Sequence, residues 1–93
     1  MLHDCRLVSL ELDWNAGSIR VWLDRYESLE NFIQARGIRK FSLSRLEEWG
    51  PSSCIDEVVG PILDGDKLQK LTIKMQSGDQ IEITAESFSL PTA

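Results

Sequence analysis

The feature that most constrains this chain is an alternation of apolar and polar residues, which recurs in several separate segments. The clearest example lies near the carboxyl end, where two alternating segments, 71–76 and 81–86, flank the turn-forming residues Ser77, Gly78 and Asp79. A side-chain period of two is typical of a β-strand with one buried and one solvated face. The short turn predicts that the two strands pair as a hairpin. Lys74 and Glu82 lie on its outward faces and would attract each other if they stand opposite; a solvated charged face is the other reading.

The amino-terminal part of the chain shows the same alternation. A strand is expected from Cys5 to Trp14, with an apolar face made of Val8, Leu10, Leu12 and Trp14. The turn-rich residues 15–17 follow, and a second alternating segment completes another hairpin. In that second strand Trp22 falls on the face opposite the apolar residues, which are Ile19, Val21 and Leu23. Trp22 is therefore either an exposed aromatic or covered by another part of the fold.

The segment 28–37 supports two structures. A short helix near 28–36 would have apolar residues at helical spacing, with caps at Ser28 and Gly37. A strand would place Ile33 and Ala35 on one face. The strands expected on both sides favour the strand, and the helix remains the alternative.

Two further strands are expected in the middle of the chain. One follows Gly37 and reaches Arg45, and a break in its alternation predicts a bulge near Arg39 or Lys40. The other covers 54–63, and its Gly60-Pro61 pair predicts either a position at the edge of a sheet or the end of the strand at that pair.

These segments together predict a mainly β fold. We expect six or seven short strands in an antiparallel β-sandwich, roll or partly open barrel. The 93 residues have room for one hydrophobic core, so we expect a single domain over 1–93, with a loose tail from about 87 to 93. At this length the core is thin, which makes a homodimer plausible.

The charge of the chain limits its partners. The formal net charge is −5 and the isoelectric point is about 4.7, which argues against nucleic acid and against anionic membranes. A basic or neutral partner suits the whole chain better. One basic stretch (Arg36, Arg39, Lys40 and Arg45) either contacts an acidic partner or balances the acidic second half of the chain itself.

The cellular compartment expected from the sequence is the cytoplasm. No secretory signal and no apolar run long enough for a membrane helix stand out. The two cysteines, Cys5 and Cys54, are therefore expected to be reduced thiols.

Catalytic and metal-binding patterns are weak. His3 is the single histidine and lies beside Asp4 and Cys5, without the further ligands that a metal site needs. Adjacent acidic pairs rarely face one substrate, and the Asp64-Gly65-Asp66 run lacks the remaining ligands of a calcium loop. No phosphate-binding loop or nucleophile motif is present. We therefore expect no metal and no cofactor, and an enzyme that uses carboxylates brought together by the fold is only a third alternative.

One segment, 47–60, departs from the alternation. Gly50 and Pro51 predict a turn, Trp49 can cover one end of a sheet, and Ser52 or Ser53 can bind exposed backbone groups. The segment resembles a run in small bacterial proteins of uncharacterised function, Arg-x-x-Pro-Trp-Gly-Pro-Ser. The matching residues here are Arg45, Trp49, Gly50, Pro51 and Ser52, with Glu48 in place of the first proline. The resemblance covers about a dozen residues. It implies a bacterial, cytoplasmic, mostly β protein and no particular activity, and comparable small acidic proteins suggest a contact role such as that of an antidote to a toxin.

The sequence therefore predicts a non-catalytic protein–protein interaction module. The partner is another protein or a second copy of the chain. The candidate binding residues are Trp49, Ser52, Ser53, Arg45 and Trp22. The alternative is a binder of a small ligand or carbohydrate that uses an exposed tryptophan as a stacking platform.

Overall fold

The structure of the protein is a computed structural model that describes residues 5–24, 31–46, 54–65 and 67–91. These residues form six β-strands and no helix: Arg6–Asp13 (β1), Ser18–Asp24 (β2), Phe32–Leu43 (β3), Ile55–Leu63 (β4), Gln69–Met75 (β5) and Gln80–Ser89 (β6). The mainly β fold predicted from the alternation is confirmed. None of the described segments is a helix that could cross a membrane.

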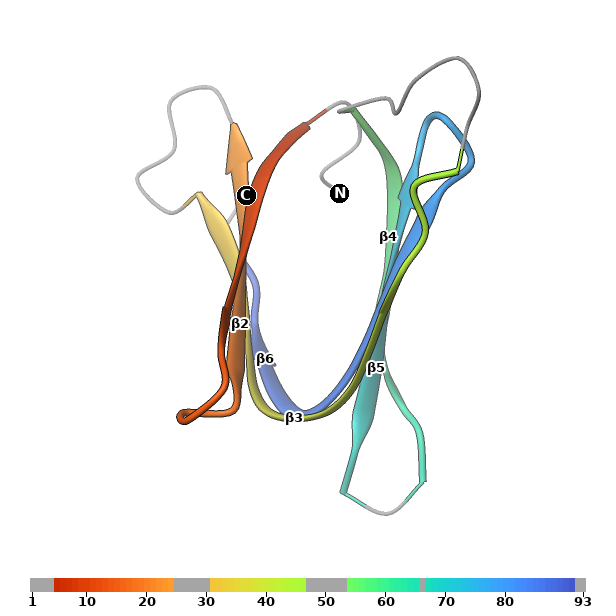
Figure 1. Cartoon of the computed structure of the whole chain (residues 1–93). Coiled ribbons are helices and arrows are strands. Elements are labelled where there is room, and N and C mark those ends of the chain that lie inside the picture. The colour runs from red at the N-terminus through yellow and green to blue at the C-terminus, as the bar shows by residue number, and fades with distance from the viewer. Residues whose placement is uncertain (1–4, 25–30, 47–53, 66, 92–93) are drawn as a thin grey trace.

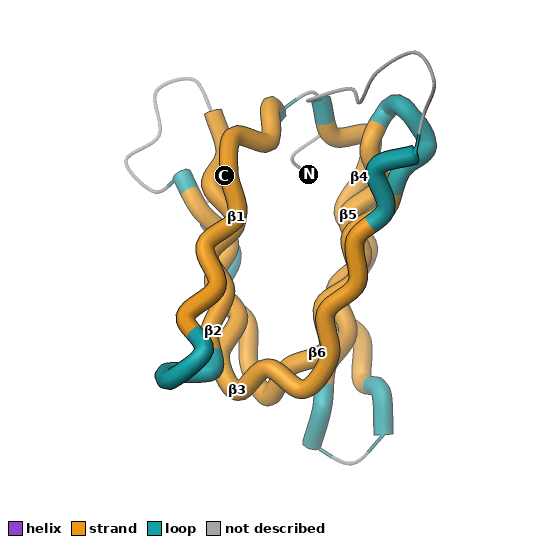
Figure 2. Tube along the Cα trace, viewed as in Figure 1, coloured by secondary structure: helices purple, strands orange, loops and turns teal. Residues whose placement is uncertain are grey.

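All six strands belong to one antiparallel sheet with the order β1-β2-β3-β6-β5-β4. The sheet is bent into a U (Figure 1). One wall of the U holds β1 and β2, the other holds β4 and β5, and the long strands β3 and β6 curve through both walls (Figures 1 and 2). Within the range of predicted folds, the sheet is therefore a roll or partly open barrel.

The bend in β3 has a local cause in the sequence. Gly37 has a φ of +68°, which a residue with a side chain rarely adopts, and the register against β6 shifts between Ile38 and Lys40. The predicted bulge near Arg39 or Lys40 is thus confirmed. Beyond this point β3 leaves β2, because β2 pairs only with Phe32–Arg36, while β6 continues beside β3 to Leu43.

The hydrophobic core fills the inside of the U. Alternate residues of the strands point inward, and the register places Ile73 of β5 beside Ile81 of β6, both fully buried. The buried apolar residues are Ile19, Val21, Leu23, Ile33, Ala35, Ile55, Leu71, Ile73, Met75, Ile81, Ile83 and Ala85. Both predicted hairpins, β1–β2 and β5–β6, are confirmed, and the buried faces of β2, β5 and β6 with them. The dry face predicted for β1 is not found, because β1 has no buried residue and its Val8 and Leu12 are exposed.

One end of the U is closed by contact between its two outermost strands. The backbone N–H of Ile55 donates to the carbonyl oxygen of Cys5 at 2.8 Å, and Arg6 forms an isolated bridge with Cys54. Ile55 points into the core, so the period of two directs Cys54 to the opposite face, while Cys5 packs against the core. No disulfide joins the two cysteines, whose side chains lie on opposite faces of the pairing.

Several details differ from the sequence-based expectations. The alternative helix near 28–36 is not formed in its described part, since residues 32–36 belong to β3; pairing with β2 on one side and β6 on the other supplies more hydrogen bonds than an isolated helical turn. The loose tail expected from about 87 is not found in its described part, because β6 runs to Ser89 and Pro91 is buried. The segment 54–63 forms β4, which lies at the edge of the sheet as predicted.

The charged pair expected across the second hairpin is also rearranged. Lys74 stands opposite Gln80 in the register and pairs with Glu57 at 3.2 Å, while Glu82 pairs with Lys70 at 3.5 Å. All four side chains are well exposed, so each pair contributes little, on the order of 0–1 kcal/mol. The outward face of this hairpin is a solvated charged surface.

Candidate functional site

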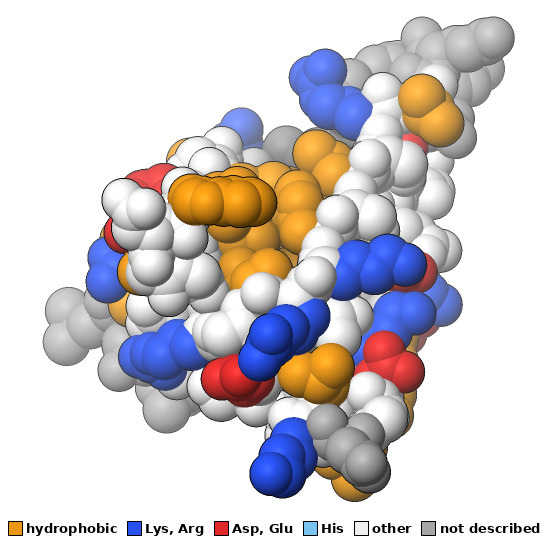
Figure 3. All heavy atoms as spheres, turned by 60° about the horizontal axis from the view of Figure 1, so that its bottom comes forward, with side chains coloured by type: hydrophobic (Ala, Val, Ile, Leu, Met, Phe, Trp, Pro, Cys, Tyr) orange, Lys and Arg blue, Asp and Glu red, His pale blue; other side chains and the backbone are white. Residues whose placement is uncertain are grey.

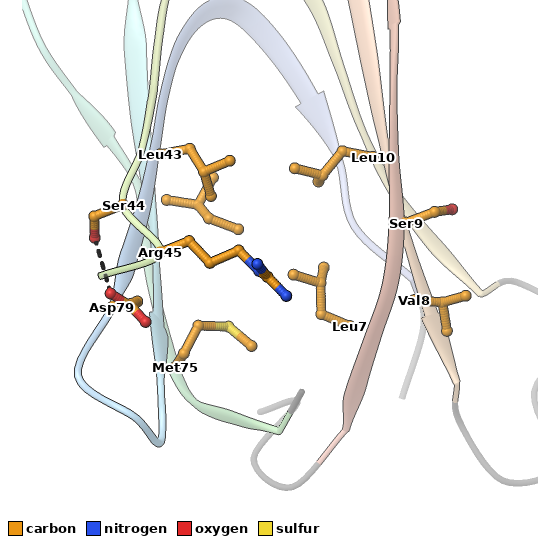
Figure 4. Close-up of a pocket in the computed structure, with 10 residues that line it drawn as sticks. Leu7, Val8, Ser9, Leu10, Leu43, Ser44, Arg45, Met75 and Asp79 are labelled. Carbon is orange, nitrogen blue, oxygen red and sulfur yellow. Dashed lines mark hydrogen bonds between the residues drawn. The ribbon is translucent and has the colours of Figure 1, made fainter. Parts of the chain in front are cut away.

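The two walls of the U leave a cavity of about 390 Å³ between them, which we call the mouth. Its lining is mostly apolar and comes from β1, from β3 and the residues after it, and from the β5–β6 hairpin. The lining residues are Leu7, Val8, Ser9, Leu10, Leu43, Ser44, Arg45, Met75, Asp79 and Ile81. In a close-up, Leu43, Arg45 and Met75 point into the cavity from one wall, toward Leu7 and Leu10 of the other (Figure 4).

The β1 side of the mouth is shaped by a bulge. The register between β1 and β2 shifts between Leu7 and Ser9, so both Leu7 and Leu10 keep their side chains on the inner face. Val8 lies within the bulge, points away from the cavity and is exposed, although the simple alternation predicted it to be buried. The bulge therefore brings two leucines to the mouth that a regular strand would have turned to opposite faces.

The opposite side of the mouth is an edge of the sheet. We call residues 40–43 of β3 the free edge, because β6 pairs with them on one side and no described strand pairs with them on the other, whereas the N–H of Ile38 still donates to the carbonyl of Gly17. Phe41 and Leu43 stand opposite the buried residues Ile83 and Ile81, so they belong to the inner face. They nevertheless remain 37% and 50% exposed, because the described part of the chain does not cover them.

Asp79 holds the chain in place where it leaves β3. Its carboxylate, in a residue only 6% exposed, accepts hydrogen bonds from the backbone N–H of Leu46 at 2.9 Å and from the hydroxyl of Ser77 at 3.0 Å. The Ser44 hydroxyl lies within 3.5 Å of the same carboxylate and also accepts a bond from the N–H of Gln80 at 3.0 Å. A buried carboxylate is tolerated when its oxygens are bonded in this way. The anchor fixes residues 44–46, and with them Arg45, at the mouth.

The basic stretch expected from the sequence divides into two parts. Arg39 forms an ion pair with Glu86 at 2.8 Å, and Arg36 donates to Ser89 and Gln34, so these two interact within the domain. Among the described residues, none forms an ion pair with Lys40 or Arg45. A space-filling view shows hydrophobic side chains gathered in a hollow, with Lys and Arg side chains at several places around it (Figure 3).

The predicted binding residues are not all brought together. Arg45 lines the mouth, whereas Trp22 lies on the outer face of β2. Trp49, Ser52 and Ser53 lie outside the described residues. The sequence analysis missed the role of Leu7 and Leu10 at the mouth and the anchoring role of Asp79. The alternation marked Leu10 only as part of a dry face and did not mark Leu7, which the bulge brings to the inner face, and it marked Asp79 only as a turn residue.

Trp22 is half-buried in an aromatic cluster. Its ring centroid lies 4.9 Å from that of Phe32, with the planes tilted by 53°, and the guanidinium of Arg20 sits 5.2 Å from the Phe32 ring. The Trp22 indole N–H is buried and has no hydrogen-bond partner among the residues that the structure describes. The sequence left Trp22 either exposed or covered by another part of the fold. The structure shows a partly covered ring, which packs against its neighbours on the sheet.

A second hollow, of about 500 Å³, lies on the outer face of the wall that holds β1 and β2. It is lined by Glu11, Leu12, Asp13, Trp14, Ser18, Arg20 and Gln34. Trp14 was predicted on the buried face of a strand, but β1 ends at Asp13 and the ring is 85% exposed in the turn that follows. Of the two tryptophans that the structure describes, Trp14 is therefore the exposed one rather than Trp22.

The described residues contain no group of three or more histidine, cysteine, aspartate or glutamate side chains that could hold a metal ion. His3 lies outside them. The enzyme alternative, which depends on carboxylates assembled by the fold, stays a prediction.

Comparison with known proteins identifies the fold and nothing more specific. No protein-family model matches the chain, and no curated protein matches it. The chain is similar in structure to an uncharacterised protein from Neisseria gonorrhoeae, with a TM-score of 0.64 and 15% sequence identity. The similarity covers 96% of this chain and 91% of the other. At this identity it shows that the two share the bent six-stranded architecture over almost their full lengths.

Proposed function

We propose that the protein is a non-catalytic interaction module that binds another protein through its mouth. The observation that carries the proposal is the gathering of exposed apolar side chains at an apolar cavity. Phe41 and Leu43 belong to the inner face yet remain exposed, and Leu46, three residues further on, is 85% exposed. Single exposed apolar residues are common on protein surfaces, but a group of them beside a cavity is typical of a contact surface.

The position of the mouth also supports this role. Its two sides belong to elements held by the sheet, and the Asp79 anchor fixes the segment that carries Leu46 and Arg45. A contact surface whose backbone is already ordered loses less conformational entropy when it binds. The mouth therefore has both the apolar surface and the rigidity of a preformed interface.

Site-specific photocrosslinking in cells of the source organism tests the proposal. A photoreactive phenylalanine analogue at Leu43 is expected to give one discrete adduct with another protein, because this side chain lies at the mouth. The matched control carries the same analogue at Ile62, an apolar residue of β4 that is 56% exposed and does not line the mouth. Equal adducts at the two positions, or none at Leu43, would reject the mouth as the contact surface.

A charged substitution supplies the second arm of the test. Leu43→Glu is expected to abolish the adduct formed from a photoreactive residue at Leu10, on the facing strand. The substitution places a charge at a half-exposed position, so the fold should survive, and circular dichroism with thermal melting checks this. An adduct that persists in folded Leu43→Glu protein would show that the contact lies elsewhere.

A second candidate function is the binding of a small saccharide in the hollow beside Trp14. The observation in its favour is an 85% exposed indole ring next to carboxylate, amide and guanidinium groups. An aromatic face with a few polar groups around it is a common small-ligand platform. Tryptophan fluorescence titrated with monosaccharides and oligosaccharides should respond in the native protein and not in Trp14→Ala. The absence of any response in the native protein would reject this function.

A further inference from the structure

The free edge of β3 presents backbone groups that no described strand uses. The N–H of Ser44 donates to the carbonyl of Gln80 at 3.0 Å, which makes this a hydrogen-bonded pair of the β3–β6 ladder. In an antiparallel ladder such pairs recur at every second residue. The N–H and C=O groups of Phe41 and Leu43 therefore turn away from β6, toward the open side of the strand.

The two faces of the free edge differ in chemistry. Leu43 faces the mouth, opposite the leucines of β1, and Phe41 lies on the same inner face of the sheet. Lys40 pairs with Thr84 in the register, so it points to the outer, solvated face. A strand added to this edge would have every second side chain in the apolar mouth and the others beside Lys40. Arg45 points into the mouth just beyond the free edge and could meet an acidic side chain there (Figure 4).

Charge decides between the possible occupants of the edge. In a dimer joined through two copies of the free edge, the Lys40 side chains of the two copies would approach each other, whereas Arg39 is already paired with Glu86. Lysine on an edge strand is a recognised barrier to such pairing. The same lysine attracts an acidic segment, and at physiological ionic strength charges beyond about 8 Å are largely screened, so the local charge outweighs the net charge of −5.

We infer that the occupant of the mouth is an extended segment of the partner protein in which acidic and apolar residues alternate, added to the free edge as a seventh strand. Its apolar side chains fill the mouth between Leu43 and the leucines of β1, and its carboxylates lie near Lys40. The inference rests on the proposed function and specifies its partner. It refines the expectation of a basic or neutral partner, which took only the total charge into account.

A short acetylated and amidated peptide of alternating glutamate and valine is the probe. It is expected to bind the full-length protein, and hydrogen exchange followed by NMR should show slowed exchange at the amides of Phe41 and Leu43. The amide of Ser42 already faces β6 and serves as the internal control. A peptide of alternating lysine and valine should not bind. Failure of the acidic peptide to bind, or equal binding of the basic one, would overturn the inference.

Methylation of the peptide backbone separates strand addition from side-chain contact. Alternate N–H groups of a strand point to opposite edges, so methylating the valine nitrogens and methylating the glutamate nitrogens remove different edges. One of the two methylated peptides is expected to lose binding, and the other to keep it. Retained binding of both would show that the backbone of the free edge is not used.

Charge reversal on the protein tests the acidic preference. Lys40→Glu combined with Arg45→Glu should weaken binding of the acidic peptide by about tenfold, in keeping with two exposed charge pairs and their reversal. The matched control, Arg20→Glu with Arg36→Glu, changes the charge equally on the outer face of the sheet and should leave the affinity within about twofold. Equal loss in both variants would assign the effect to total charge and overturn the inference.

The outcomes separate this inference from the proposed function. A crosslink at Leu43 with no binding of the acidic peptide keeps the mouth as a protein contact and rejects strand addition. Sedimentation velocity of the protein alone tests whether a second copy of the chain occupies the free edge. A dimer that Leu43→Arg dissociates would assign the edge to a second copy and overturn the inference of an acidic segment.

Discussion

Removing the carboxylate of Asp79 should strongly destabilise the protein. In Asp79→Ala, the Leu46 N–H and the Ser77 hydroxyl lose a charged acceptor at 2.9 and 3.0 Å, and the Ser44 hydroxyl loses a weaker contact at 3.5 Å. A hydrogen bond to a charged group contributes roughly 1.5–3 kcal/mol, and such losses are not additive within one network. Two short hydrogen bonds are lost, but water can partly satisfy their donors after the substitution. The free energy of unfolding is therefore expected to fall by about 2–4 kcal/mol.

This loss is large for a domain of this size. At roughly 0.05–0.15 kcal/mol per residue, the free energy of unfolding of a chain of 93 residues is about 5–14 kcal/mol. A loss of about 2–4 kcal/mol then lowers the Tm by roughly 10–20 °C. Because the same carboxylate fixes residues 44–46, the variant should also lose the photocrosslink at Leu43 at temperatures where it is still folded.

Urea denaturation followed by circular dichroism measures the effect. Asp64→Ala is the matched control, since it removes the same carboxylate from an exposed position and should change the free energy of unfolding by less than about 0.5 kcal/mol. Asp79→Asn keeps one acceptor oxygen and should fall between the two. If Asp79→Ala unfolds at the same urea concentration as Asp64→Ala, the carboxylate is not an anchor and the reasoning is wrong.

Three other substitutions test separate parts of the structure. Gly60→Ala should destabilise the protein by about 2–4 kcal/mol more than Gly65→Ala in urea denaturation. Both glycines have a positive φ, but of the two only Gly60 would place a Cβ 2.5 Å from a backbone oxygen of β5. Equal losses in the two variants would contradict this close approach. Trp14→Ala should change the Tm by no more than about 2 °C, since the ring is 85% exposed, and a larger fall would show that it packs against the fold. Trp22→Phe should stay within about 1 kcal/mol of the native protein, because the lost contact area is offset by removal of a buried N–H without a partner; a loss above about 3 kcal/mol would mean that the N–H is bonded.

Much of the fold could be predicted from local patterns. The hairpins β1–β2 and β5–β6, the edge position of β4 and the bulge near Arg39 or Lys40 were all visible in the alternation and in its breaks. The candidate site was less accessible. Arg45 was singled out and lies at the mouth, but its neighbours there come from β1 and from the β5–β6 hairpin, about 30 or more residues away in the chain.

What the sequence by itself determined was which residues form strands and, in β2, β5 and β6, which face of the strand is dry. Its physical basis is local, since a pleated strand exposes alternate side chains to opposite sides and water favours burial of the apolar set. What only the tertiary structure decided was how the sheet curves and where its edges lie. The bend at Gly37 leaves Phe41 and Leu43 on a dry face with no strand beside them, and the packing of the β5–β6 turn against residues 44–46 buries Asp79. The alternation of apolar and polar residues cannot predict the exposure of Phe41 and Leu43 or the burial of Asp79, because both depend on which distant strands meet.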